Sequence, residues 1–167
     1  NIARLSWGWL PVRRSYTFDG CEGQTVEVHI YAGADEVELF QNGMSMGTLP
    51  CGEEQGYQAV FSIPYQPGTL EAVTRRCGAE NGRDILHTAG EVAGLALYPD
   101  KTAVREGGEE LCLLSIQAVD KDGVPVFDAD GEITVKLSGG QLLALGSADP
   151  KPNRNALYYK DTCPLYE

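Results

Sequence analysis

The stretch at residues 25–47, TVEVHIYAGADEVELFQNGMSMG, decides the fold of this chain of 167 residues. Aliphatic residues stand at every second position in two runs of it, at Val26, Val28 and Ile30 and again at Val37 and Leu39. This period of two is typical of strands with one buried face. Asn42-Gly43 then predicts a two-residue hairpin turn, because both positions of such a turn adopt positive φ angles.

Met44 and Met46 begin the strand that returns from this turn. A hairpin with a single apolar face is not stable alone in water and needs a second sheet packed over that face. The stretch therefore predicts an antiparallel β-sandwich.

The rest of the first half continues the strand pattern. A third alternating run covers residues 57–63, a Pro67-Gly68 corner follows, and a further strand is expected at residues 69–76. Asn81-Gly82 predicts a second hairpin, whose return strand covers residues 84–88.

The second half starts the pattern again after Gly90. Apolar alternation predicts strands around residues 95–97, 114–119 and 133–137, and a short buried run at residues 142–146. The pattern contains no convincing amphipathic helix. The predicted fold class is all-β, with two tandem immunoglobulin-like antiparallel β-sandwich domains at residues 1–90 and 91–167.

The net charge of −11 argues against nucleic acid and membrane surfaces as partners, because both are anionic. No run approaches the roughly 18 apolar residues of a spanning helix, and no basic segment precedes an apolar stretch near residue 1, so no signal peptide is predicted either. The five cysteines are odd in number and form no C-x-x-C pair, which fits ordinary thiols. These observations favour a cytoplasmic location.

Trp7-Gly8-Trp9 is the first candidate binding feature. Two tryptophans at i and i+2 of an extended strand share a face, and flat indoles suit the apolar faces of sugar rings. Tyr57 and Tyr65 are further candidate carbohydrate contacts. The alternative is that these rings pack inside the sandwich or against a neighbouring domain, as large aromatic side chains usually do.

The sequence assigns no catalytic residue. Glu36 and Glu38 lie about 6.5–7 Å apart along one strand and point the same way. The two catalytic carboxylates of a glycoside hydrolase must instead flank the substrate from opposite sides. His29 and His87 have no nucleophile-like serine or cysteine turn beside them.

The aspartates of residues 120–130 suggest calcium at first. A calcium loop that begins at Asp120 needs glycine at its sixth position and glutamate at its twelfth, and the chain has Pro125 and Gly131 there. Asx-type turns explain Asp120, Asp122, Asp128 and Asp130 better. No metal site and no cofactor are predicted, since no glycine-rich loop leads into a helix that would hold a phosphate.

Several motifs together resemble the C-terminal region of β-galactosidase-type enzymes of glycoside hydrolase family 2. The resemblance spans nearly the whole chain and is most specific in the string D-E-V-E-L-F-x-N-G at residues 35–43. The other matching motifs include Trp7-Gly8-Trp9, Ile63-Pro64-Tyr65, Leu95-x-Leu97-x-Pro99-Asp100 and Val119-Asp120-x-Asp122-Gly123. The family has a jelly-roll, an immunoglobulin-like domain and a catalytic (β/α)₈ barrel ahead of this region, and both of its catalytic glutamates lie on the barrel.

The resemblance implies a non-catalytic accessory region of an enzyme of carbohydrate metabolism. Its expected partners are the barrel and the preceding domains of the same parent chain, with a homo-oligomer contact and carbohydrate as further candidates. The family pattern also implies that the second domain lacks its last strand here, or that a neighbouring molecule covers the open edge. Two other functions stay open at this point: a carbohydrate-binding module that uses Trp7 and Trp9, and a surface adhesion module.

Overall fold

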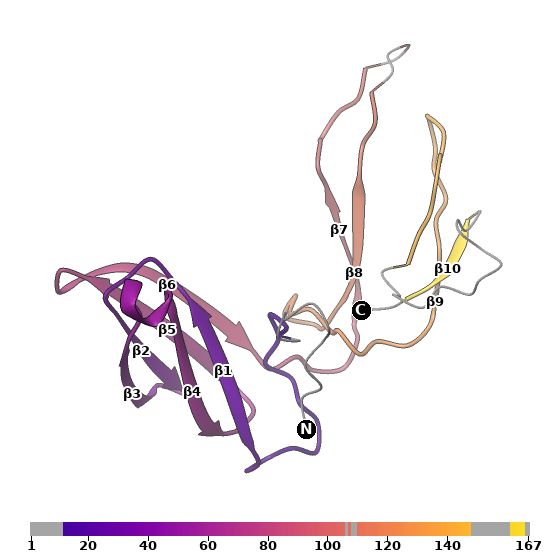
Figure 1. Ribbon diagram of the computed structural model, residues 1–167. Coiled ribbons are helices and arrows are strands. Elements are labelled where there is room, and N and C mark those ends of the chain that lie inside the picture. Colours follow the sequence, from indigo (N-terminus) through magenta and orange to yellow (C-terminus); the bar gives the residue numbers. More distant parts are fainter. Residues whose placement is uncertain (1–11, 106, 108–109, 148–160, 166–167) are drawn as a thin grey trace, which may run out of the picture. The chain divides into compact units, whose positions relative to one another are not determined.

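The computed structural model describes residues 12–105, 107, 110–147 and 161–165 (Figure 1). The chain divides into two compact units, unit 1 at Asn1–Ala89 and unit 2 at Gly90–Glu167, which are taken one at a time below. Within the described residues all strands pair antiparallel and no α-helix is present, so the all-β prediction is confirmed. No helix in this part of the chain is long and apolar enough to cross a membrane.

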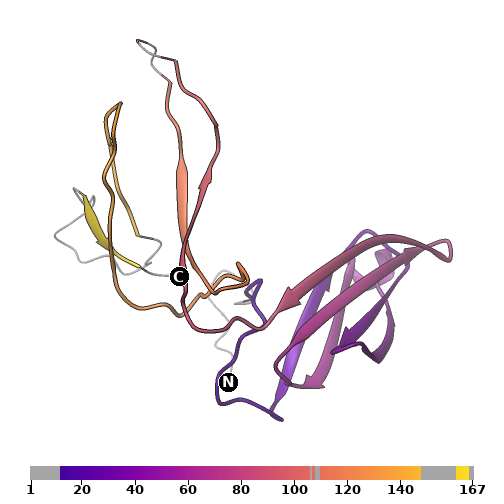
Figure 2. The same ribbon diagram turned by 180° about the vertical axis from the view of Figure 1, so that it is seen from behind.

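Unit 1 consists of two sheets that face each other (Figures 1 and 2). One sheet pairs β1 (Thr25–Tyr31) with β4 (Gln58–Pro64). The other has the order β3-β2-β5-β6, and its strands are β2 (Glu36–Gln41), β3 (Met44–Pro50), β5 (Thr69–Arg76) and β6 (Ala79–His87). A short 3₁₀ turn, η1 (Glu53–Gln55), connects β3 to β4.

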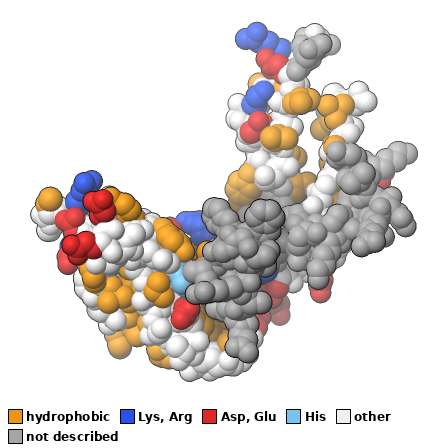
Figure 3. All heavy atoms as spheres, in the orientation of Figure 1, with side chains coloured by type: hydrophobic (Ala, Val, Ile, Leu, Met, Phe, Trp, Pro, Cys, Tyr) orange, Lys and Arg blue, Asp and Glu red, His pale blue; other side chains and the backbone are white. Residues whose placement is uncertain are grey.

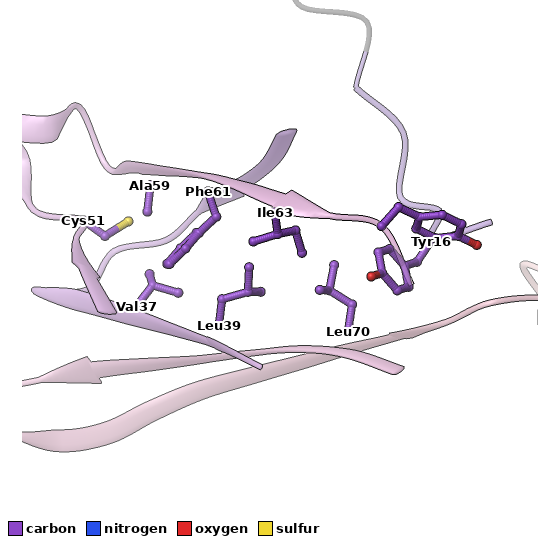
Figure 4. Packing of buried hydrophobic residues seen from close by; sticks show 9 residues of the cluster. Tyr16, Val37, Leu39, Cys51, Ala59, Phe61, Ile63 and Leu70 are labelled. Carbon is purple, nitrogen blue, oxygen red and sulfur yellow. The ribbon is translucent and has the colours of Figure 1, made fainter. Parts of the chain in front are cut away.

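The core of unit 1 lies between these sheets, as Figure 4 shows. Val37 and Leu39 of β2 are fully buried and meet Phe61 and Ile63 of β4, which are 5% and 3% exposed. Buried residues alternate along both strands, as a period of two requires. Tyr16 closes one end of the core.

The first hairpin turn is confirmed at Asn42-Gly43, where the φ angles are 51° and 79°. The predicted second turn is wrong. Arg76 pairs with Ala79, so the turn is Cys77-Gly78, with φ angles of 51° and 77°. Asn81-Gly82 lies inside β6 instead, where a Cβ on the glycine would approach a side chain of β5 to 2.8 Å.

Unit 2 contains two two-stranded sheets in the described residues. β7 (Gly94–Pro99) pairs with β8 (Leu114–Val119), and β9 (Glu132–Thr134) pairs with β10 (Thr162–Pro164). The run at residues 142–146 is not the buried segment that was predicted, because Leu143 is 66% exposed. The missing last strand of this domain stays a prediction.

Candidate functional site

Three carboxylates of the larger sheet of unit 1, on Glu38, Glu71 and Glu80, make ion pairs with arginines of the same sheet. Glu38 lies 2.9 Å from Arg75 and accepts a hydrogen bond of 2.9 Å from the Ser45 hydroxyl. These two partners, the hydroxyl first, lower the pKa of Glu38. A general acid needs the opposite shift, so Glu38 is unsuited to protonate a leaving group.

Arg83 of β6 organises two further carboxylates on the same sheet. Its guanidinium pairs with Glu71 on β5 and makes two bonds to Glu80, of 2.9 and 3.0 Å. The carboxylates are thus held by an arginine rather than presented toward a substrate.

The two histidines take part in hydrogen bonds at the sheet surfaces. The His29 ring lies 2.9 Å from the Gln58 amide nitrogen, and the His87 ring lies 3.2 Å from the Thr69 hydroxyl. No group of three or more metal-ligating side chains occurs in the residues that the structure describes.

Asp120 makes the Asx-type turn that the sequence predicts. Its carboxylate accepts backbone hydrogen bonds from Asp122 at 2.9 Å and Val124 at 2.8 Å, and a third from Gly90 at 2.9 Å. The Gly90 N–H group is the chief cause of its lowered pKa. This 7%-exposed carboxylate therefore joins the start of unit 2 to the turn after β8.

The candidate carbohydrate contacts differ in their positions. Tyr65 is fully buried and stacks edge-on against Tyr16 and Phe18, so its ring offers no face to a sugar, and this part of the prediction is corrected. The Phe18 N–H group donates to the Tyr65 hydroxyl at 3.2 Å. Tyr57 is 50% exposed. Trp7 and Trp9 lie outside the described residues.

Sequence reasoning missed the buried pair of Tyr16 and Gln41. The Gln41 amide donates to the Tyr16 hydroxyl at 2.6 Å and to the Pro64 carbonyl at 2.8 Å. The sequence did contain a signal for this pair. Gln41 stands at an inward position just before Asn42-Gly43, and a buried amide needs hydrogen-bond partners.

All five cysteines are free thiols. Cys51 and Cys163 are buried, and burial raises the pKa of Cys163. Cys77 and Cys112 are exposed.

An open groove of about 480 Å³ lies between β1 and β6 of unit 1. Its lining includes the core residues Leu39 and Leu70 and the half-buried Val28, Ile30, Ala72 and Leu86. Arg14 and Asp84 form an ion pair of 2.7 Å at its rim. Asp84 is the one carboxylate among the described lining residues, so this lining lacks the carboxylate pair of a glycosidase.

One face of the β7–β8 sheet of unit 2 is apolar and is exposed along β7. Leu95 pairs with Ala118 and Leu97 with Ile116, which places these side chains on one face. Leu95 and Leu97 are 51% and 58% exposed, and Figure 3 shows hydrophobic side chains at the surface of this region. The other large exposed hydrophobic residues among the described part of unit 2 are Val92, Tyr98, Val104, Leu111, Leu113, Leu114, Leu137 and Leu143. On the same face Ala118 is only 4% exposed, and Leu114 and Ile116 line a pocket with Ile133 and Cys163, so the exposed part of this face is its β7 side.

Two family models match separate parts of the chain. A domain of unknown function, DUF4982, matches residues 23–82, and the glycoside hydrolase family 2 C-terminal domain 5 matches residues 95–161. A curated relative, the β-galactosidase BoGH2A of Bacteroides ovatus, is 28% identical over 139 residues, which are 83% of this chain and 15% of the relative.

Solved structures agree with these matches. A glycosyl hydrolase family 2 member from Bacteroides cellulosilyticus has a TM-score of 0.85 and 26% identity, over 100% of this chain and 22% of that one. A β-glycosidase from Bacteroides vulgatus has a TM-score of 0.81 and 31% identity, over 91% of this chain and 19% of that one. The chain thus spans 15–22% of the length of these three relatives.

The fold and surface define an all-β module of the kind that occurs in long, multidomain glycoside hydrolases. Residues 95–161 match a C-terminal domain of glycoside hydrolase family 2, and the chain corresponds to a C-terminal region of such enzymes, as the motifs predicted.

Proposed function

We propose that this chain is a non-catalytic accessory region of a β-galactosidase-type enzyme, and that it contacts other domains of its parent chain, above all the catalytic barrel. The exposed leucines of β7, Leu95 and Leu97, carry this proposal. Covering the exposed surface of these leucines with a partner would stabilise the contact by about 25 cal/mol for each Å² of apolar surface removed from water. The similar proteins are several times longer than this chain, so a parent of that size would supply such a partner.

The chemistry of unit 1 supports a non-catalytic role. Glu38, Glu71 and Glu80 are paired with Arg75 or Arg83, and the lining of its groove has a single carboxylate among the described residues. Hydrolysis of a glycosidic bond needs two, on opposite sides of the bond. We also infer that the two units are separate domains at residues 1–90 and 91–167, since each family model falls within one unit.

Two measurements test this function. The purified chain should release no chromophore from a chromogenic β-galactoside above the uncatalysed rate.

In a parent enzyme that contains this region, Leu97→Gln should lower the unfolding temperature, because a polar side chain would replace a leucine that the partner domain covers. Tyr98→Gln is the matched control, since Tyr98 pairs with Ser115 on the opposite face and is similarly exposed. Turnover by the chain alone, or equal effects of both substitutions, would contradict the proposal.

A further inference from the structure

The outer edge of β7 has no neighbouring strand in the described part of the chain, where β7 pairs with β8 alone. The other side of β8 is already engaged, because the Val126 N–H group donates to the Ala118 carbonyl at 2.9 Å. Open strand edges carry backbone N–H and C=O groups that need partners, and natural sheets usually protect them. The edge of β7 is therefore the side of this sheet at which a strand can be added (Figure 1).

The backbone groups of Leu95 and Leu97 point to this open edge. The Asp100 N–H group donates to the Leu113 carbonyl at 2.9 Å, and these two residues continue the pairing register of β7 with β8. Along an antiparallel strand, the N–H and C=O groups of successive residues alternate between the two sides of the strand. Those of Asp100 and Ala96 therefore face β8, and those of Leu95 and Leu97 face outward.

β7 lacks the features that protect other strand edges of the chain. It has no charged residue between Gly94 and Pro99, and its register with β8 is regular throughout. The edge strands β3 and β6 of unit 1 each contain a register shift, and β6 also carries Glu80, Arg83 and Asp84. An uncharged, regular and apolar edge strand is prone to pair with another chain.

We propose that β7 pairs antiparallel with β7 of a second copy of this chain, which joins the two β7–β8 sheets into one continuous sheet. Ala96 faces Ala96 of the second copy on the two-fold axis, and Leu95 of each copy faces Leu97 of the other. In this register the outward N–H and C=O groups of Leu95 and Leu97 bond to each other across the axis. A two-fold contact of this kind uses the same strand of both copies and closes on itself.

The side chains around β7 fit this register. Leu95 and Leu97 are 51% and 58% exposed, and pairing would gather the leucines of both copies on one shared face. Toward each end of the strands, Glu91 comes to the level of Lys101 of the second copy, so opposite charges meet. This contact uses the edge of the strand and leaves the leucine face open, so it is independent of the contact with the barrel proposed above.

The mass of the 167-residue chain in solution tests the pairing. Each copy carries a net charge of −11, which opposes association, so the measurement is made at about 0.15 M salt, where charges more than about 8 Å apart are largely screened. Sedimentation velocity from micromolar to millimolar concentration should show a dimer that grows at the expense of the monomer. A chain that stays monomeric over this range would overturn the proposal, and so would species that grow beyond the dimer.

Hydrogen exchange followed residue by residue tests the strand and the register in the native chain. The amides of Leu95 and Leu97 should exchange several-fold more slowly at the concentrations where the dimer forms. The Ala96 amide, which faces β8 within one copy, should not change. A dimer held by the leucine face instead would leave the Leu95 and Leu97 amides unprotected, and that result would overturn the proposal.

A pair of lysine variants tests the two-fold axis. Ala96→Lys places lysines of the two copies directly opposite each other and should weaken the dimer several-fold, with a smaller loss at high salt. Gln117→Lys is the matched control, because Gln117 is the β8 partner of Ala96 and lies on the same face, away from the axis. Circular dichroism checks that both variants fold. Equal effects of the two substitutions, or a dimer that folded Ala96→Lys leaves unchanged, would overturn the proposal.

Discussion

At the scale of single residues, Asn42 joins two turns of unit 1. Its side chain accepts a hydrogen bond of 2.7 Å from the Thr69 N–H group and donates one of 3.1 Å to the Pro67 carbonyl. Gly68 lies directly beneath it with a φ of +132°, and a Cβ at that position would lie 2.0 Å from the Asn42 side-chain oxygen. Gly68 thus needs both the backbone freedom and the missing side chain of glycine.

Gly68→Ala should therefore lower the free energy of unfolding of unit 1 by about 2 kcal/mol, through strain and the loss of the Asn42 bonds. Chemical denaturation followed by circular dichroism measures this loss. Gly33→Ala is the control, since a Cβ there meets nothing within 4 Å and the φ angle is ordinary. Equal stability of the two variants would contradict the role of Gly68.

Asp120 makes stability depend on pH. Its pKa is lowered in the folded chain, chiefly by the Gly90 N–H group. The carboxylate therefore contributes stability above the unfolded aspartate pKa of about 3.9, and this contribution is lost as pH falls through the lower folded value.

Asp120→Asn should lower the unfolding temperature of unit 2 at neutral pH, because it weakens three backbone hydrogen bonds. The difference from the native chain should shrink as the pH falls below about 4. Thermal unfolding between neutral pH and pH about 3 checks this. Asp122→Asn is the control, since Asp122 makes an exposed ion pair with Lys121, and such pairs contribute little. A difference in unfolding temperature between the two chains that grows as the pH falls would contradict this role of Asp120.

At the scale of elements, the hairpin of β5 and β6 turns at a residue that is poorly suited to it. Cys77 has a φ of 51°, in the left-handed region that asparagine tolerates better than most residues. Its N–H group donates to Asp35 at 2.7 Å, and an asparagine would keep that bond.

Cys77→Asn should raise the free energy of unfolding by roughly 0.5–1 kcal/mol, because Asn-Gly is a favoured pair for this kind of turn. The midpoint of urea unfolding measures the gain. Cys112→Asn removes another exposed thiol and serves as the control. A stability below that of the native chain would count against the assigned turn.

This hairpin also shows where sequence reasoning reaches its limit. Asn81-Gly82 is the stronger local signal, yet the observed turn lets Leu70 pair with Leu86 and keeps both against the core. Cross-strand pairing thus outweighed turn preference. The alternating runs, which report burial directly, predicted β1, β2, β4, β5 and β8 well.

Candidate binding residues were harder to judge from the sequence. Tyr65 stands two residues after Ile63, the last inward residue of β4, so it continues the alternation and its ring packs into the core. The groove depends on β1 and β6, which are about fifty residues apart, so no local pattern indicates it.

At the scale of the whole molecule, the hydrophobic cluster around Leu39 draws all its members from unit 1. If the two units are separate domains, they should unfold separately. Leu39→Ala should destabilise unit 1 by about 2–5 kcal/mol, the usual cost of a cavity at a fully buried leucine.

Differential scanning calorimetry of the native chain should show two transitions, and Leu39→Ala should move only one of them. Leu143→Ala is the control, because Leu143 is 66% exposed and its loss should change stability by less than about 0.5 kcal/mol. A single transition that shifts as a whole would show that the units fold together.

The distribution of the free thiols has a practical consequence. Cys77 is exposed on unit 1 and Cys112 on unit 2, Cys21 of unit 1 is partly exposed, and Cys51 and Cys163 are shielded. A maleimide reagent should therefore label Cys77 and Cys112 ahead of the shielded pair. With Cys21 replaced by serine, a donor and an acceptor dye at these two sulfurs would turn the chain into a molecular ruler for the spacing of its halves, with no added attachment point.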